Sequence, residues 1–438
     1  MKLRTILFIT TTALLVSSVQ AQKKWTLQEC IQHAIVNNLT IRKTALEVDN
    51  SEIDLDTRKW ARLPNLSASA GENLSWGKVT SNDNTYVYDM HNTSTNLGLN
   101  TEVPLFTGFE LPNQYKLAKL NLKAAIEDLN KAKEDVSVNV ATLYIDVLFN
   151  MEIFNVAKEQ VLLSKQQLAR MEKLREVGKA APAEVAEARA RVAQDEMTQV
   201  EAENKYNISL LDLSQLLDLP TPQGFAISTL DIEPKFKPLT PPDDIFIDAI
   251  AIKPEIKAAE YRLEGSENSI RIAQSGYYPT LSFGARFGSN YNTYNGKGNP
   301  FFTQLKDNKA TSIGFNLSIP IFNRFATRNR VRTARLQQTN YSIALDQTKK
   351  DLYKEIQQAW HNAVAAESKY NTSSVAVAAN EESFRLMTEK FENGQATSVE
   401  FNEAKLNLMK ALSDKIQAKY SYLFRTKILD FYKGIPIQ

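Results

Sequence analysis

The sequence contains a long tandem duplication, which limits the folds that the chain can adopt. The segment EKLREVGKAAPAEVAEARAR, residues 172–191, has a counterpart in EKFENGQATSVEFNEAKLNL, residues 389–408. Gly178 and Gly394 lie 216 positions apart, and the spacing falls to 215 nearer the N-terminus. Three further pairs keep the spacing of 216: Pro104 with Pro320, Tyr144 with Trp360 and Pro220 with Pro436. The unit is far longer than a solenoid repeat, so each copy is expected to be domain-sized.

Residues 1–21 have the pattern of a cleaved secretory signal. Two basic residues precede the apolar run ILFITTTALLV, and Val19 and Ala21 are small residues at the spacing that cleavage requires. The run is shorter than the ~20 residues that span a bilayer, so export is favoured over anchoring. Cys30 is the single cysteine. It excludes a disulfide framework, and we expect it to be a small buried residue.

The charge balance excludes one large class of partners. The chain has 52 Lys and Arg residues against 50 Asp and Glu residues. Nucleic-acid binding requires a clear basic excess, so nucleic acid is not an expected partner. Beyond the signal we identify no second long apolar segment, so any membrane crossing is expected to occur without helices.

Each unit contains two segments with the two-residue period of β-strands. Apolar residues alternate with small or polar ones in TSIGFNLSIPIF (311–322), TLSFGARFG (280–288) and TSTNLGLNTEVPLF (93–106), and more weakly in NLSASAG (65–71). This pattern is typical of barrel strands with lipid outside and water inside. A soluble antiparallel sheet with one wet face gives the same alternation, so the strands alone leave both interpretations open.

The connections favour the membrane interpretation. Long polar loops are expected at residues 77–92 and 289–309, where a soluble hairpin would use two to five residues. Aromatic residues cluster where strands meet loops or helices, as in an interfacial girdle: Trp76, Phe106, Tyr277, Tyr278, Tyr291, Phe301, Phe302 and Phe322. Four strands cannot close a barrel, because about eight is the smallest number that works. The chain is therefore expected to form an oligomer.

The remainder of each unit is predicted to be helical. Apolar residues recur at spacings of three and four in residues 111–177, and a run of this length reaches roughly 100 Å. Its partner helix is predicted at residues 182–217, and the second pair at 327–393 and 398–432. Helices this long do not fit a compact domain, so we expect extended helical hairpins.

A proline-rich segment separates the two units. Residues 219–243 contain six prolines, which predicts an extended linker. The resulting organisation is a signal peptide at 1–21, a first repeat at 22–218, the linker at 219–243 and a second repeat at 244–438. Each repeat is expected to contain a helix, two strands and a long helical hairpin.

This arrangement resembles the TolC-like outer membrane efflux proteins, also called outer membrane factors. The resemblance rests on the duplicated units, on the Pro104 and Pro320 junctions and on a Gly-x-x-x-x-x-Glu motif at each hairpin tip, and it covers essentially the whole mature chain. It implies a mixed α and β membrane protein that forms a homotrimer. Each protomer would give four transmembrane strands to one twelve-stranded β-barrel, which a twelve-helix α-barrel would continue through the periplasm.

The resemblance also implies a function and a set of partners. The chain would be the outer-membrane channel of a tripartite efflux or type I secretion system in a Gram-negative bacterium. Its partners would be a periplasmic adaptor, an inner-membrane RND or ABC transporter and outer-membrane lipid, with no cofactor. A periplasmic coiled-coil adaptor is the alternative, although two hairpins and two strand pairs favour the channel. An enzyme is not indicated, because His33, His91 and His361 are scattered and the cysteine has no evident partner.

The hairpin tips are the predicted docking site for the adaptor. Glycine just past a helix end commonly adopts the left-handed conformation, which explains Gly178 and Gly394 structurally. Two similar turns in each protomer would also give a repeated surface to adaptor hairpins. The predicted docking residues are Gly178, Lys179, Gly394 and Gln395.

The resemblance further implies a gate at the periplasmic end. Glu400 and Glu403 stand where the family has two acidic residues, and Phe391 and Ala396 replace the Tyr and Arg that often help to latch the closed state. A looser or differently fastened gate is therefore expected. The first-repeat counterparts of the two acidic residues are Glu184 and Glu187. Helix capping is an alternative role for Glu400, since Thr397 to Glu400 forms a capping-box sequence, and for Glu184, near Pro182 at the first helical position.

Overall fold

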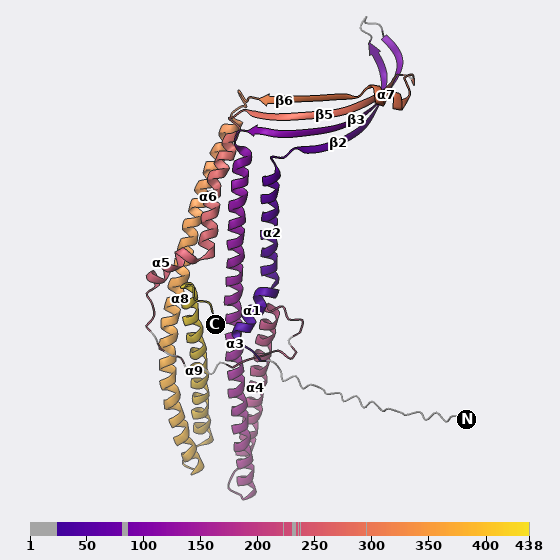
Figure 1. Cartoon of the computed structure of the whole chain (residues 1–438). Helices are drawn as coiled ribbons and strands as arrows, with labels where there is room; N and C mark the ends of the chain where they lie inside the picture. The colour runs from indigo at the N-terminus through magenta and orange to yellow at the C-terminus, as the bar shows by residue number, and fades with distance from the viewer. Residues whose placement is uncertain are drawn as a thin grey trace, which may run out of the picture.

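The computed structural model of the chain shows a long helical body with a sheet at one end (Figure 1). It describes residues 24–80, 86–221, 223–229, 234, 236, 238–294 and 296–437. The predicted signal peptide, residues 1–21, lies outside the described residues. Both hairpin tips lie at the end of the body far from the sheet.

Each repeat has the same order of elements. The first contains α1 (Leu27–Asn37), α2 (Leu39–Trp60), β2 (Asn65–Thr80), β3 (Tyr86–Thr107), α3 (Glu110–Glu176) and α4 (Pro182–Leu216). The second contains α5 (Pro242–Ile252), α6 (Pro254–Ser275), β5 (Thr280–Tyr294), α7 (Phe301–Asp307), β6 (Ala310–Ser318), α8 (Ala326–Glu392) and α9 (Ser398–Tyr432). The four predicted long helices are confirmed, with every boundary within one residue of its prediction.

The duplication is visible in the helix boundaries themselves. Helices α3 and α8 each have 67 residues, and α4 and α9 each have 35. Their first residues lie 216 positions apart, from Glu110 to Ala326 and from Pro182 to Ser398. Both long helices also begin after a phenylalanine in the left-handed conformation, Phe109 (φ 67°) and Phe325 (φ 62°).

The four strands form one antiparallel sheet in the order β2-β3-β5-β6. Residues paired across antiparallel strands share a face, and Val103, Phe283 and Phe315 make one apolar row. The rings of Phe283 and Phe315 lie 5.3 Å apart. Polar rows alternate with these apolar rows, as where Asn100 pairs with Arg286. The predicted alternation is therefore confirmed as one apolar and one polar face of a single sheet.

The long polar loops predicted within each strand pair are wrong in extent. In the first repeat, β2 and β3 remain paired through Gly77↔Met90 and, after a register shift, as far as Thr80↔Tyr86. In the second, β5 continues to Tyr294, and the short helix α7 follows. Backbone hydrogen bonds hold a hairpin whatever its side chains, so polar composition alone does not identify a loop.

A two-stranded sheet joins the residues just before α1 to the linker. Strand β1 (Lys24–Trp25) pairs in parallel with β4 (Ala226–Ile227), and the buried Tyr144 hydroxyl donates to the carbonyl oxygens of Trp25 (3.1 Å) and Ser228 (2.7 Å). Part of the linker therefore pairs as a β-strand. The linker also ends earlier than predicted, because α5 begins at Pro242, where a proline costs no helical hydrogen bond.

The main hydrophobic core lies around the middle of the two longest helices. Tyr144 and Leu148 of α3 and Ile356 of α8 are fully buried in it, and so is Cys30, as predicted. Burial raises the pKa of the Cys30 thiol to about 12, so the group is inert at neutral pH.

The prediction of no second long apolar segment is wrong. By length and composition, one stretch within α3 could cross a membrane. That stretch is 39% buried within the protomer, and α3 supplies Val140, Tyr144 and Val147 to the core. Packing in the helical body accounts for its apolar character.

Candidate functional site at the hairpin tips

The two hairpins end in turns of the same geometry. Gly178 (φ 72°) and Gly394 (φ 70°) adopt the left-handed conformation. The next amide closes each turn: Lys179 N donates to Leu174 O and Gln395 N to Lys390 O, both at 2.8 Å. This is the Schellman pattern that satisfies the last carbonyls of a helix. All four predicted docking residues are exposed at the tips, while docking itself stays a prediction.

Glu400 and Glu184 both cap their helices. Glu400 Oε2 accepts from the Thr397 amide (2.8 Å) and from its hydroxyl (2.9 Å). These hydrogen bonds lower the pKa of the Glu400 carboxyl. Glu184 Oε2 accepts from the Ala181 amide at 2.7 Å, at the corresponding point of the first repeat. The capping role is therefore present in both repeats, whatever else these carboxylates do.

Two polar contacts join the hairpins near their tips. Arg170 of α3 forms an ion pair with the Glu392 carboxylate (3.0 Å) and donates to its backbone carbonyl (3.3 Å). On the other helices, the Ser398 hydroxyl donates to Glu187 at 3.0 Å. These contacts join the first repeat to the second near the tips. The sequence predicted that the family's Tyr and Arg latch is absent from this region, because Phe391 and Ala396 stand in those positions.

Phe391 and Ala396 take no part in polar fastening. The ring of Phe391 stacks on Phe401 of the same hairpin, with centroids 4.8 Å apart and planes 22° apart. Ala396 has no polar side-chain atom, so it cannot replace an arginine. Glu403 is exposed one turn beyond Glu400 on α9. The spacing of three places both carboxylates on one side of that helix.

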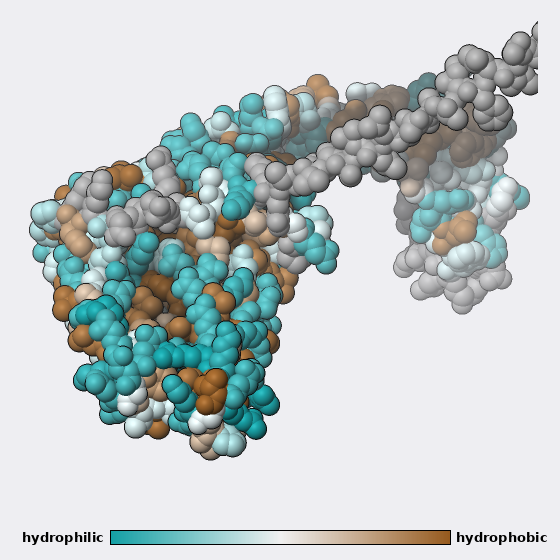
Figure 2. All heavy atoms as spheres, turned by 90° about the horizontal axis from the view of Figure 1, so that it is seen from below, coloured by the Kyte–Doolittle hydropathy of each residue, from teal (hydrophilic) through white to brown (hydrophobic). Residues whose placement is uncertain are grey.

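A cavity of about 570 Å³ lies between the hairpins near the tips. Six of the ten predicted site residues line it: Lys179, Glu184, Glu187, Phe391, Gly394 and Ala396. The other four, Gly178, Gln395, Glu400 and Glu403, do not. Seen from the side of the tips, the helical body is largely hydrophilic (Figure 2). In the described part of the chain, no cluster of His, Cys, Asp and Glu is suited to hold a metal ion.

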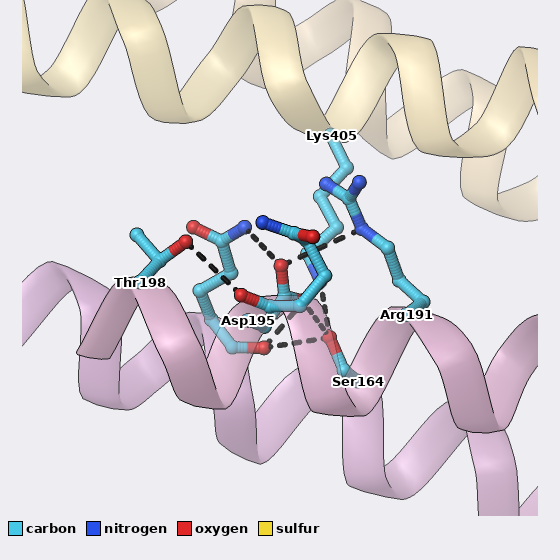
Figure 3. A network of polar contacts seen from close by, with 7 residues as sticks. Ser164, Arg191, Asp195, Thr198 and Lys405 are labelled. Atoms are coloured by element: carbon cyan, nitrogen blue, oxygen red, sulfur yellow. Dashed lines mark hydrogen bonds and ion pairs between the residues drawn. The ribbon is translucent and has the colours of Figure 1, made fainter. Parts of the chain in front are cut away.

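Sequence reasoning missed a buried polar network beside this cavity (Figure 3). Lys405 of α9 and Asp195 of α4 are each 2% exposed and form an ion pair at 2.9 Å. Lys405 Nζ also donates to Ser164 Oγ (2.6 Å), and Gln160 Nε2 donates to Asp195 Oδ1 (2.7 Å). The network therefore joins α9 of the second repeat to the α3–α4 hairpin of the first.

Burial determines the electrostatics of this network. Desolvation lowers the pKa of Lys405, and the hydrogen bond and charge of Asp195 partly offset that effect. Arg191 adds a second cation 3.5 Å from Asp195 Oδ1. One signal could have revealed the pair in advance. Lys405 interrupts a buried apolar stripe on α9 that contains Phe401, Ala404, Leu408 and Ala411.

Comparison with known proteins identifies the family. A family model described as outer membrane efflux protein matches residues 30–218 and 247–431, one segment for each repeat. The chain belongs to the outer membrane efflux protein family. This efflux protein is 22% identical over 405 residues to the outer membrane efflux protein BepC of Brucella suis, covering 92% of this chain and 83% of BepC. It is 23% identical over 413 residues to the outer membrane protein TolC of Salmonella enteritidis, covering 93% and 82%.

Solved structures confirm the fold of this efflux protein. The Campylobacter jejuni CmeC outer membrane channel superposes with a TM-score of 0.79 at 19% identity, over 94% of this chain and 85% of that one. The outer membrane protein VceC of Vibrio cholerae superposes with a TM-score of 0.77 at 16% identity, over 94% and 97%. The predicted resemblance and the outer-membrane location are thereby confirmed. Membership of a family of outer membrane channels also decides against the adaptor alternative.

Proposed function

We propose that the chain is one protomer of a trimeric channel that carries substrates across the outer membrane. The observation that carries this proposal is the four-stranded sheet, with one apolar face, one polar face and open edges at β2 and β6. Such edges bind other strands unless something covers them. Three copies joined β6 to β2 would close a twelve-stranded barrel, with the polar faces around water and the apolar faces against lipid.

The dimensions of the sheet suit a bilayer. Ten residues of β5 separate Leu281 from Tyr291, which is roughly 33 Å along the strand at about 3.3 Å per residue. A tilt of about 40° converts this length to a height of roughly 25 Å, the usual apolar band of such barrels. The predicted aromatic girdle also divides into two levels. Phe106 and Phe322 lie at the helical end of the sheet, and Tyr291 and Phe301 contact each other at the other end, with ring centroids 4.9 Å apart.

The helical body would continue this barrel as a tunnel through the periplasm. Its tips, Gly178 with Lys179 and Gly394 with Gln395, would dock a periplasmic adaptor that connects the channel to an inner-membrane RND or ABC transporter. The exposure and matching geometry of the two turns support this role. Relatives named for pyoverdine export and for protease secretion indicate that such channels serve more than one kind of substrate.

The narrow end of the tunnel would contain the gate. Three-fold symmetry would bring the Glu400 and Glu403 carboxylates of three protomers around one opening, with Glu184 and Glu187 beside them. A ring of carboxylates attracts cations, so the open channel would be cation-selective. The contacts of Arg170 with Glu392 and of Ser398 with Glu187 would hold the closed arrangement in place of the absent Tyr and Arg latch.

A pair of neighbouring substitutions on β6 tests the proposed barrel. Ile313 belongs to the apolar face and pairs with Ala285, near the middle of the span from Leu281 to Tyr291. Ile313→Arg should therefore cost about 2–4 kcal/mol if that face meets lipid near mid-membrane. Gly314→Arg introduces the same charge on the polar face and should be tolerated, because nothing lies within 4 Å of an added Cβ. The measurement is the yield of trimer in outer-membrane fractions that float on a density gradient. Equal yields from the two variants would show that the faces are assigned wrongly.

A further inference from the structure

The beginning of α8 is unusually basic. Between Asp307 and Asp346 the sequence has no acidic residue, but it has one lysine and five arginines: Lys309, Arg324, Arg328, Arg330, Arg332 and Arg335. At 3.6 residues per turn, Arg328, Arg332 and Arg335 fall on one side of α8, and Arg330 falls on the opposite side. We call the three arginines on one side the basic stripe.

The basic stripe lies on the side of α8 that continues the apolar face of the sheet. A cavity of about 820 Å³ at the junction of sheet and helices is lined by Ser318, Arg330 and Gln337, but not by the stripe. Ser318 belongs to the polar set of β6 residues, which includes Asn316 and alternates with Leu317. The polar face therefore continues into Arg330, and the apolar face continues into the stripe.

The first repeat shows that this side stays accessible when helices pack on both flanks. The counterparts of Arg332 and Arg335 in α3 are Lys116 and Lys119. Helix α3 already has α2 on one flank, where Arg58 donates to Gln114 at 3.3 Å, and α6 on the other. Lys116 and Lys119 are nevertheless exposed. A neighbouring protomer packed on α8 would leave the stripe exposed in the same way.

An exposed phenylalanine lies in the strained turn directly before α8, at the membrane end of the basic stripe, and its counterpart lies directly before α3. Phe325 is 57% exposed and Phe109, its counterpart, is 56% exposed, and both have positive φ. A bulky residue in that conformation is strained, and glycine would avoid the strain. The same strained backbone occurs in both repeats. Phe109 packs on Phe106 and Phe325 packs on Phe322, yet more than half of each residue's surface stays free, so the ring is available to a ligand outside the protomer. The Arg328 guanidinium lies 5.8 Å from the centre of the Phe325 ring.

We propose that the basic stripe and Phe325 bind the head groups of anionic phospholipids in the inner leaflet of the outer membrane. This inference rests on the proposed placement of the sheet in the membrane. Arg328 and Arg332 lie two and six residues into α8, or about 3 and 9 Å below its start. The head-group layer is about 5–8 Å thick on each side of the hydrocarbon. Helical side chains lean toward the N-terminus of their helix, which here points toward the membrane.

Lipid binding by the purified full-length trimer tests the proposal. The trimer in detergent is titrated with phosphatidylglycerol or phosphatidylcholine, and bound lipids are counted by native mass spectrometry. Phosphatidylglycerol should bind more tightly, and added salt should reduce the difference. Arg328→Gln and Arg332→Gln, the two stripe residues nearest the membrane, should each weaken phosphatidylglycerol binding roughly five-fold, so the double variant should lose roughly 25-fold.

The matched control is the charge on the opposite side of the same helix. Arg332→Gln should weaken phosphatidylglycerol binding, and Arg330→Gln should leave it unchanged. Equal binding of the two lipids, or equal effects of these two variants, would overturn the proposal while leaving the channel intact. A trimer that retains neither lipid would instead refute the placement of the sheet in the membrane, and the lipid site with it.

Discussion

The buried ion pair between Lys405 and Asp195 gives the sharpest test of how the hairpins are held together. Lys405→Met keeps most of the side-chain volume but leaves the Asp195 carboxylate 2% exposed without its lysine. Removing one partner of a buried pair costs about 3–5 kcal/mol. Arg191 remains 3.5 Å from Asp195, so we expect the lower end of that range.

Hydrogen exchange of the α9 amides measures this cost locally. Opening of α9 around Lys405 exposes its amides, so a loss of about 3 kcal/mol accelerates their exchange on the order of a hundredfold. Lys410→Met is the matched control, because Lys410 is exposed on the same helix. It should leave exchange nearly unchanged.

A double variant separates the loss of the pair from the loss of the lysine alone. Replacing a whole buried pair by apolar residues is often neutral or stabilising. Lys405→Met combined with Asp195→Leu should therefore recover most of the protection, apart from the hydrogen bonds that Gln160 and Ser164 lose. Unchanged exchange in Lys405→Met, or a double variant as labile as the single one, would refute the reasoning.

Two further predictions concern the tips and the gate. Gly394→Trp should abolish export by blocking the docking surface. The trimer should still reach the outer membrane, because nothing lies within 4 Å of an added Cβ, although the positive φ strains the new residue. Loss of the trimer would make the glycine purely structural. In planar bilayers the trimer should prefer cations and be blocked by multivalent cations from the periplasmic side, because the lowered pKa of Glu400 keeps it ionised at neutral pH. Glu400→Gln with Glu403→Gln should weaken both effects; a double variant that conducts and blocks like the parent would place selectivity elsewhere.

Features that depend on neighbouring residues were predictable from the sequence. Gly178 and Gly394 set where α3 and α8 end, and Pro182 and the Thr397 cap set where α4 and α9 begin. Glycine, proline and capping residues act within one turn of a helix, so their effect can be read from the sequence. The two faces of the sheet follow from the two-residue period of each strand. That period depends only on the residues of the strand itself, so no neighbouring strand is needed to predict it.

Features that depend on distant residues were decided only by the tertiary structure. The polar hairpin beyond Gly77 pairs as strand because β3 lies beside β2, although its composition is that of a loop. Lys405 and Asp195 meet 210 positions apart because α9 packs against the other hairpin, and the sequence shows only that each is charged. Local rules set where each element begins and ends, whereas the energy of a buried pair exists only after packing has excluded water from it.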